Sequence, residues 1–187
     1  MGRWEPDAQR RLREAALDLF EEQGYEETTV AQIAERTGVT ARTFFRHFAD
    51  KREVLFAGST LLQDRLIDAI ASVAPDQSPF DAAVAAVAQA FDGLGVTRTA
   101  ARRRSNVIAG TAELRERELI KMASLAEALA GGLRQRGAGD PEAALAAESA
   151  IAAMRVAFER WVRARSGPSL IDEYHATVIA LRAVTAT

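Results

Sequence analysis

Apolar residues among the first fifty positions recur at helical spacing and predict three short helices. In the first of these segments, residues 7–24, five of them follow the i, i+3, i+4, i+7, i+8 spacing of one buried face: Leu12, Ala15, Ala16, Leu19 and Phe20. Val30 with Ile33, and then Phe44 with Phe48, continue the pattern further along the chain. Helices this short are not stable alone, so we expect the three to pack around a common core.

Residues with strong capping preferences separate the second and third of these helices. Thr29 followed by Gln32 forms a capping box for the second helix, and Thr40 is the N-cap candidate of the third. Between them, Gly38 can adopt the left-handed conformation that ends a helix. The segment therefore predicts two short helices joined by a tight turn. This is the layout of a helix-turn-helix, whose second helix enters the DNA major groove.

A longer helix is expected directly afterwards. Asp50 and Glu53 form another capping pair that starts a helix at Lys51. Apolar residues continue at helical spacing to about Ala74, and Pro75 ends the helix. At this length it would be roughly 36 Å long, so a tilt at its far end would move the recognition helix.

Caps, glycines and prolines divide the remaining chain into five further helices, expected near 79–92, 97–108, 112–136, 141–165 and 169–185. We therefore expect an all-α protein of about nine helices. A three-helix, homeodomain-like helix-turn-helix domain would occupy residues 1–50. A larger helical domain would occupy residues 51–187, joined to the first by the continuous helix 51–74.

The outer side of the predicted recognition helix carries the candidate DNA contacts. Phe44 and Phe48 lie four residues apart and face inward together. Six side chains then remain toward the groove or the DNA backbone: Ala41, Arg42, Thr43, Phe45, Arg46 and His47. Arg42 and Arg46 are the candidates for base recognition, because arginine can donate two hydrogen bonds to guanine O6 and N7. The alternative for each is a phosphate contact, which positions the protein without specifying sequence.

Three further residues are candidate contacts to the DNA outside the bases. Thr40 and Thr29, in the first turns of their helices, can donate hydrogen bonds to phosphate. Arg3 is a candidate for the adjacent minor groove, with a disordered terminus as the alternative.

The same segment resembles a known family. Its residues are similar to those of the TetR/AcrR-type bacterial transcriptional regulators at Ala15, Ala16, Leu19, Phe20, Gly24, Tyr25, Thr29, Ile33, Ala34, Gly38, Val39, Thr40, Thr43, Phe44, Phe45, His47, Phe48 and Lys51. Beyond about residue 55 the resemblance consists of length and helical character. It implies a homodimer that binds a palindromic operator and is released by a small molecule bound in the C-terminal domain. It also implies that Lys51 contacts phosphate, with a solvated lysine as the alternative.

One position departs from the pattern of most members of this family, although a subset of them resembles this chain in the arrangement Arg-Thr-Phe-Phe-Arg-His-Phe. Its members usually carry a tyrosine where this chain has Phe45, and the tyrosine hydroxyl commonly contacts phosphate. Phe45 can make only apolar contacts, to a sugar or to a thymine methyl group.

The last two predicted helices are apolar on nearly every side, which predicts burial against a partner chain as well as the chain's own core. The candidate dimer-interface residues are Ala147, Ile151, Met154, Leu170, Tyr174, Val178 and Leu181. The alternative is an internal position in a monomer. Nine apolar residues are candidates to line an effector pocket, with an ordinary core as the alternative: Leu62, Leu66, Phe91, Val107, Met122, Leu125, Met154, Phe158 and Trp161. Few polar groups accompany them, which favours an apolar or amphipathic effector.

Composition excludes several kinds of site. The chain has 187 residues and no cysteine, and its two histidines, His47 and His175, lie far apart in sequence. No Gly-rich phosphate loop or metal-ligand pattern occurs, so we expect no catalytic site, metal or cofactor. No signal sequence or membrane span is expected either, which favours a cytoplasmic protein.

Charge is unevenly distributed along the DNA-binding segment. The net charge of the chain is −2, and residues 1–56 hold 9 Lys and Arg against 11 Asp and Glu. Basic residues concentrate in residues 42–52, whereas the acidic residues Glu21, Glu22, Glu26 and Glu27 sit at the end of the first helix. We interpret those acids, and the arginines 102–104, as solvated helix surfaces.

The helix-turn-helix pattern favours a DNA-binding protein, and the family resemblance implies a ligand-responsive transcriptional regulator that acts as a repressor. The alternative is an architectural or activating DNA-binding protein without a ligand. An enzyme with an appended DNA-binding domain is less favoured, since no catalytic constellation is present.

Overall fold

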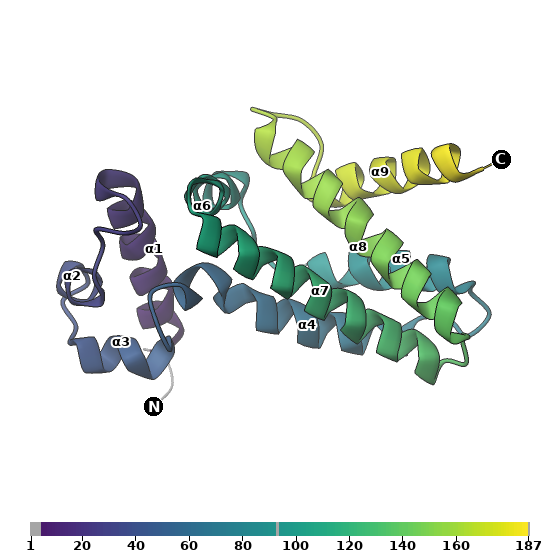
Figure 1. Ribbon diagram of the computed structural model, residues 1–187, viewed down its shortest axis with the longest axis horizontal. Coiled ribbons are helices and arrows are strands. Elements are labelled where there is room, and N and C mark those ends of the chain that lie inside the picture. Colours follow the sequence, from purple (N-terminus) through teal and green to yellow (C-terminus); the bar gives the residue numbers. More distant parts are fainter. Residues whose placement is uncertain (1–4, 93, 187) are drawn as a thin grey trace. The chain divides into compact units, whose positions relative to one another are not determined.

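A computed structural model of the chain describes residues 5–92 and 94–186 (Figure 1). Over these residues the regular structure consists of nine α-helices, with no strand. The first four are α1 (Glu5–Gln23), α2 (Val30–Arg36), α3 (Ala41–His47) and α4 (Glu53–Ser72). The next five are α5 (Pro79–Phe91), α6 (Arg98–Gly110), α7 (Ala112–Gln135), α8 (Asp140–Arg163) and α9 (Leu170–Thr185). The all-α prediction is confirmed.

The helices form two compact units. The head unit takes in the described residues up to Gly58 together with Ala100–Glu118. The body unit takes in Ser59–Thr99 and the chain from Leu119 onward. Residues 51–58 and 100–118, which the sequence placed in the second domain, thus pack with the helix-turn-helix.

The head unit has a core of its own. It is built from apolar residues of α1 to α4, with two more from α6 and α7: Leu12, Ala16, Leu19, Phe20, Tyr25, Ile33, Phe44, Phe48, Val54, Leu55, Phe56, Ile108 and Leu114. Burying a side chain of leucine or phenylalanine size stabilises a fold by about 1.5–3 kcal/mol. Ile108 and Leu114 therefore make the α6–α7 corner part of the head core.

The body unit is organised around alanine-rich helices. Its core joins residues of α4, α5, α7, α8 and α9, and α8 packs against both α5 and α9. Small residues allow close approach: a Cβ atom added at Gly132 of α7 would overlap the side chain of Ile70 of α4. The Arg136 side chain caps the C-terminal end of α4, where it donates hydrogen bonds to the carbonyl oxygens of Ile70, Val73 and Ala74. None of the helices, over the part of the chain described, is long and apolar enough to cross a membrane.

Helix α4 begins two residues later than expected. Asp50 Oδ1 accepts hydrogen bonds from the backbone N–H groups of Arg52, at 2.8 Å, and of Glu53, at 3.0 Å. The carboxylate thus caps the chain at 52 and 53, and the helix starts at Glu53 instead of Lys51. The capping role of Asp50 was predicted correctly, but the starting residue was not.

Candidate nucleic-acid interface

The starts of α2 and α3 are fixed by local hydrogen bonds that the sequence predicted. Thr29 Oγ1 accepts from the N–H of Gln32, and the Gln32 side chain accepts from the N–H of Thr29, so the capping box is complete. Gly38 has a φ of +71°, in the left-handed region that favours glycine. Thr40 caps α3 by accepting from the N–H of Thr43 at 3.2 Å. These bonds fix where α3 starts and therefore which of its side chains face outward.

Packing of α3 on the head core divides it into an inner and an outer side. Phe44 is fully buried, and its ring lies 5.4 Å from that of the buried Phe48. On the outer side, Arg42, Phe45 and Arg46 are all exposed. Their spacing of i, i+3 and i+4 places these three side chains on one face of the helix. We call this set the α3 stripe.

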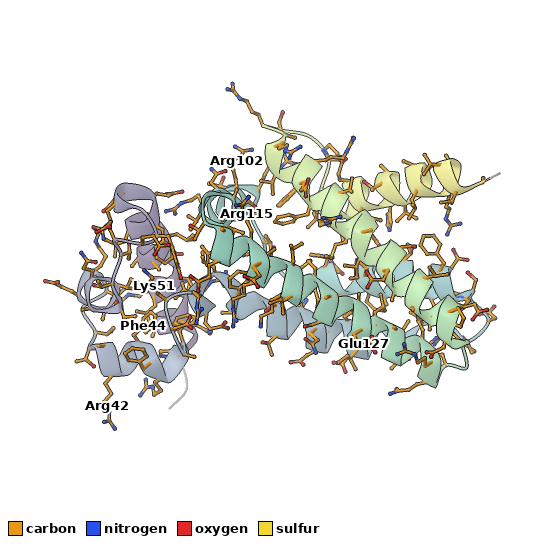
Figure 2. The ribbon with its side chains drawn as sticks, viewed as in Figure 1. Arg42, Phe44, Lys51, Arg102, Arg115 and Glu127 are labelled. Carbon is orange, nitrogen blue, oxygen red and sulfur yellow. The ribbon has the colours of Figure 1, made fainter. Side chains whose placement is uncertain are left out.

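The two arginines of the α3 stripe are available to an external ligand. Figure 2 shows Arg42 projecting outward from α3. Among the residues that the structure describes, no hydrogen bond or ion pair engages the guanidinium group of Arg42 or Arg46. Each can therefore donate to guanine edges or to phosphates without first breaking an interaction within the protein.

Other predicted contact residues are placed less favourably. His47 is half-buried, and its Nε2 is buried without a hydrogen-bond partner among the described residues. At five residues from Arg42, it lies well around the helix from the α3 stripe. Ala41 is exposed and Thr43 is half-buried, and the Thr43 hydroxyl lies 3.1 Å from that of Thr40. Arg3 lies outside the described residues.

The predicted phosphate contact at Lys51 has a different environment in the structure. Its Nζ donates to the carbonyl oxygens of Tyr25, Glu26 and Thr28 at 2.8, 3.1 and 3.0 Å. An ammonium group has three donors, so these bonds use its full capacity. The same Nζ lies 4.4 Å from the centroid of the Tyr25 ring. Lys51 thus holds the α1–α2 connection, and a phosphate contact would require it to leave this site.

Arg52, which also belongs to the basic run of residues 42–52, is likewise engaged within the head unit. It donates to Asp50 Oδ2 at 2.7 Å and to Glu113 Oε1 at 2.5 Å. Burial alone would raise the pKa of Asp50, but the hydrogen bonds from Arg52 and from the N–H of Glu53 outweigh it and lower the pKa below its usual 3.8. With Lys51 and Arg52 occupied, the α3 stripe supplies the free positive charge of this region.

The acidic residues at the end of α1 are exposed, as expected, but Arg103 and Arg104 are half-buried and are not simple solvated surface. Arg103 pairs with Asp18 at 2.6 Å and with Glu21 at 2.7 Å. Glu22 pairs with Arg36 at 2.7 Å. These pairs join residues far apart in sequence, so a local sequence pattern does not predict them.

Arg104 makes the most extensive of these connections. It donates to the carbonyl oxygen of Leu55 at 2.7 Å and pairs with Glu118 at 2.6 Å. Its guanidinium also lies 5.2 Å from the ring centroid of the buried Phe56, and that of Arg117 lies 5.8 Å from the same ring. Arginine side chains of α6 and α7 therefore hold the first turn of α4 within the head unit.

The candidate pocket residues do not form one group. Five of them, Leu62, Leu66, Phe91, Leu125 and Met154, meet in the body core, where the packing leaves no room for a water molecule. Met122 packs against the same core. Val107 instead packs against the head core, and Phe158 and Trp161 form a separate ring pair at 6.0 Å. The structure therefore contains a closed apolar core at the predicted pocket position.

The candidate dimer residues lie on the inward faces of α8 and α9. Ala147, Ile151, Met154, Tyr174 and Val178 are buried in the body core, and Leu181 packs against it. Leu170 is half-buried.

The outward faces of the two helices carry a different set of apolar side chains, which are largely exposed: Leu145, Val156, Ile179 and Val184. Leu145 and Leu181 also line a surface groove of about 350 Å³ between α5, α8 and α9. The sequence alone does not distinguish the inward face of these helices from the outward face, because alanine occurs on both.

Comparison with known proteins agrees with this geometry. Residues 12–57 match the family model described as "Bacterial regulatory proteins, tetR family". The chain is 45% identical over 71 residues to the HTH-type transcriptional regulator TcmR of Streptomyces glaucescens. The matched region covers 38% of this chain and 31% of the relative. It is 32% identical over 99 residues to the HTH-type transcriptional regulator BetI of Klebsiella pneumoniae. This region covers 51% of this chain and 51% of the relative. The matches thus span about half, or less, of the length of these curated relatives.

Solved structures extend the likeness of fold to nearly the whole chain. SmeT, the repressor of the Stenotrophomonas maltophilia multidrug efflux pump SmeDEF, matches with a TM-score of 0.60 and 17% identity over 94% of this chain and 89% of its own. The fatty acid degradation regulator FadR from Bacillus halodurans matches with a TM-score of 0.63 and 19% identity, over 95% of this chain and 96% of its own. Residues 12–57 thus match the tetR family of bacterial regulatory proteins, and the all-helical fold of the chain is similar to that of these solved structures.

Proposed function

We propose that the chain is a ligand-responsive repressor that binds a palindromic operator as a homodimer. The observation that carries its DNA-binding part is the α3 stripe: two exposed arginines without internal partners among the described residues, on the second helix of the helix-turn-helix. In a helix-turn-helix this helix lies in the major groove, where arginine recognises guanine.

The outward faces of α8 and α9 support the dimeric part of the proposal. Ile179 of α9 is 69% exposed and Leu145 of α8 is 68% exposed. Large apolar side chains gathered on two neighbouring helices mark a surface that a partner can cover. We assign that partner as a second copy of this chain, since two copies related by a two-fold axis would present two α3 stripes to a palindromic site.

The body core supports an effector that is apolar or amphipathic. The five candidate residues that meet there are all apolar, and the space between them is too small for a water molecule in this conformation. An effector would therefore have to separate helices that are now packed, at a cost that its own apolar burial must exceed. A ligand that binds only the opened body would shift the population toward that state and change operator affinity.

The proposal is tested with the full-length chain and a duplex selected by it from a random-sequence pool. We expect two symmetry-related half-sites in the selected duplex, two chains bound per site, and affinity that falls with rising salt. Titration with a panel of fatty acyl, aromatic and cationic amphiphilic compounds should then release the DNA. Selection of no preferred sequence would contradict the DNA-binding part.

The remaining alternative is a regulator or architectural protein without a ligand. It would select a duplex in the same way but keep its affinity across the whole panel. Thermal unfolding in the presence of each compound separates the two cases further, because an effector that binds the folded body raises its melting temperature.

A further inference from the structure

We infer that Phe45 is a specificity-determining residue that contacts the methyl group of a thymine in each operator half-site. The inference rests on the proposed DNA-binding function and extends it to one chemical group of the DNA. The C5-methyl group of thymine lies in the major groove and distinguishes an A·T pair through apolar contact.

The position of Phe45 is the first reason for this assignment. It is 56% exposed, whereas its neighbour Phe44 is fully buried. More than half of its side chain therefore lies outside the head core and is available to a ligand. Within the α3 stripe it lies one helical turn from Arg42 and directly before Arg46, on the face that would point into the groove.

The second reason is that the ring is held in a defined orientation. Its centroid lies 5.6 Å from that of Phe44, and the two rings are nearly perpendicular, at 86°. Edge-to-face pairs of this kind are favourable beyond their buried area. The buried Phe44 therefore positions the Phe45 ring before DNA binds, which lowers the entropic cost of an ordered contact.

The third reason is chemical. Phe45 has no hydrogen-bonding group, so it cannot bind a phosphate oxygen or a polar base edge. The flanking arginines bring the face into contact with a polyanion, and an apolar group on that face then needs an apolar partner in the groove.

Helix geometry also predicts where the thymine lies. Residues 42 and 45 are separated by about 4.5 Å along the helix, and successive base pairs by about 3.4 Å. With α3 lying along the groove, the thymine should lie one or two base pairs from the guanine that Arg42 recognises.

Replacement of thymine by deoxyuridine tests the inference, because it removes the methyl group and leaves base pairing unchanged. In the duplex selected by the wild-type protein, each thymine is replaced in turn and the dissociation constant is measured. We expect one replacement per half-site to weaken binding about fourfold, the loss that corresponds to one methyl group. The Phe45→Ala variant should bind the unmodified duplex more weakly and should lose sensitivity to that replacement.

Two controls keep the test specific. Phe45→Leu retains an apolar side chain and should keep part of the sensitivity to the methyl group. Leu119→Ala removes a side chain of matched exposure, 59%, from α7 and should leave the whole profile unchanged.

Equal sensitivity of the wild type and Phe45→Ala to every deoxyuridine would overturn the inference. So would a wild-type profile without a sensitive thymine. In both cases sequence-selective binding by the wild type would leave the proposed function standing, whereas its absence would refute that function instead.

Discussion

The ammonium group of Lys51 lies 4.4 Å from the centroid of the Tyr25 ring and donates a 2.8 Å hydrogen bond to the carbonyl oxygen of the same residue. Two further carbonyl oxygens, of Glu26 and Thr28, complete its hydrogen bonds. A lysine bound in this way fixes the chain between α1 and α2, which in turn positions the capping box of α2. Its charge is engaged within the head unit, so the DNA contacts that we propose for this region depend on the α3 stripe.

Replacement of Lys51 by methionine should destabilise the protein without changing how its DNA binding depends on salt. Methionine keeps the length of the side chain but leaves three carbonyl oxygens without their charged donor. We expect the free energy of unfolding to fall by about 2 kcal/mol in urea denaturation. A salt slope reduced by about 1 with unchanged stability would show instead that Lys51 neutralises a phosphate.

Replacement of Arg42 by alanine should reduce both affinity and base preference. The side chain is exposed, so stability should change little, whereas operator binding should weaken by about 1–3 kcal/mol. Competition between single-base variants of the selected duplex is the measurement, and preference should relax at one position per half-site. An equal loss on all sequences would identify a phosphate contact, and Arg46→Ala provides the matched comparison on the same stripe.

The cap formed by Asp50 should make stability depend on acid pH. Its pKa is lowered in the folded state, so its stabilisation is present above the unfolded value near 3.8 and is lost as the pH falls through the folded value. Asp50→Ala should cost about 1 kcal/mol at pH 7. The difference in unfolding free energy between the wild type and Asp50→Asn should narrow at more acid pH, measured by urea denaturation from pH 7 downward. A difference that stays constant would contradict the role of the charge.

An acidic residue on the outward face of α9 should separate the proposed dimer. Ile179→Glu places a charge where we expect a second copy to pack, and Leu119→Glu makes the same change at a site of similar exposure on α7. Sedimentation equilibrium should show a monomer for the first variant and a dimer for the second. Two dimeric variants would place the interface elsewhere.

Loss of Arg104 should destabilise the head unit strongly. Its removal takes away the hydrogen bonds that it donates to Glu118 and to the carbonyl oxygen of Leu55, and its contact with the Phe56 ring. We expect Arg104→Met to lower the unfolding free energy by about 2–3 kcal/mol. Arg115→Met, at an exposed position of α7, should have almost no effect in the same urea titration. Similar stabilities for the two variants would mean that the contacts of Arg104 contribute little.

The fold was predictable from sequence where its causes are local. Thr29, Thr40 and Asp50 all cap as their neighbours in sequence indicated, and Gly38 adopts the left-handed conformation that the turn requires. Each of these features needs only residues within about four positions, which a pattern can reveal. The start of α4 was misplaced because Asp50 accepts from two backbone N–H groups, and a capping pair does not specify which comes first in the helix.

The environment of the candidate site was predictable only in part, because charge alone does not reveal its partners. Lys51 and Arg52 belong to the same basic run as Arg42 and Arg46, yet their partners include residues 23 to 61 positions away. Arg103 and Asp18 are separated by 85 positions. Such pairs follow from the tertiary fold. The exposed pair on α3 could be identified because helical spacing separates it from the buried Phe44 and Phe48.

The inclusion of residues 100–118 in the head unit has a practical consequence for protein engineering. A DNA-binding module excised at residue 58, or grafted from this chain onto another body, would lack Ile108, Leu114 and the guanidinium groups that cover Phe56. The excised fragment would expose apolar surface that water does not reach in the full chain. A working chimaera would need to transplant the discontinuous segment as well, or supply an α6–α7 corner whose arginines and acids match those of α1 and α4.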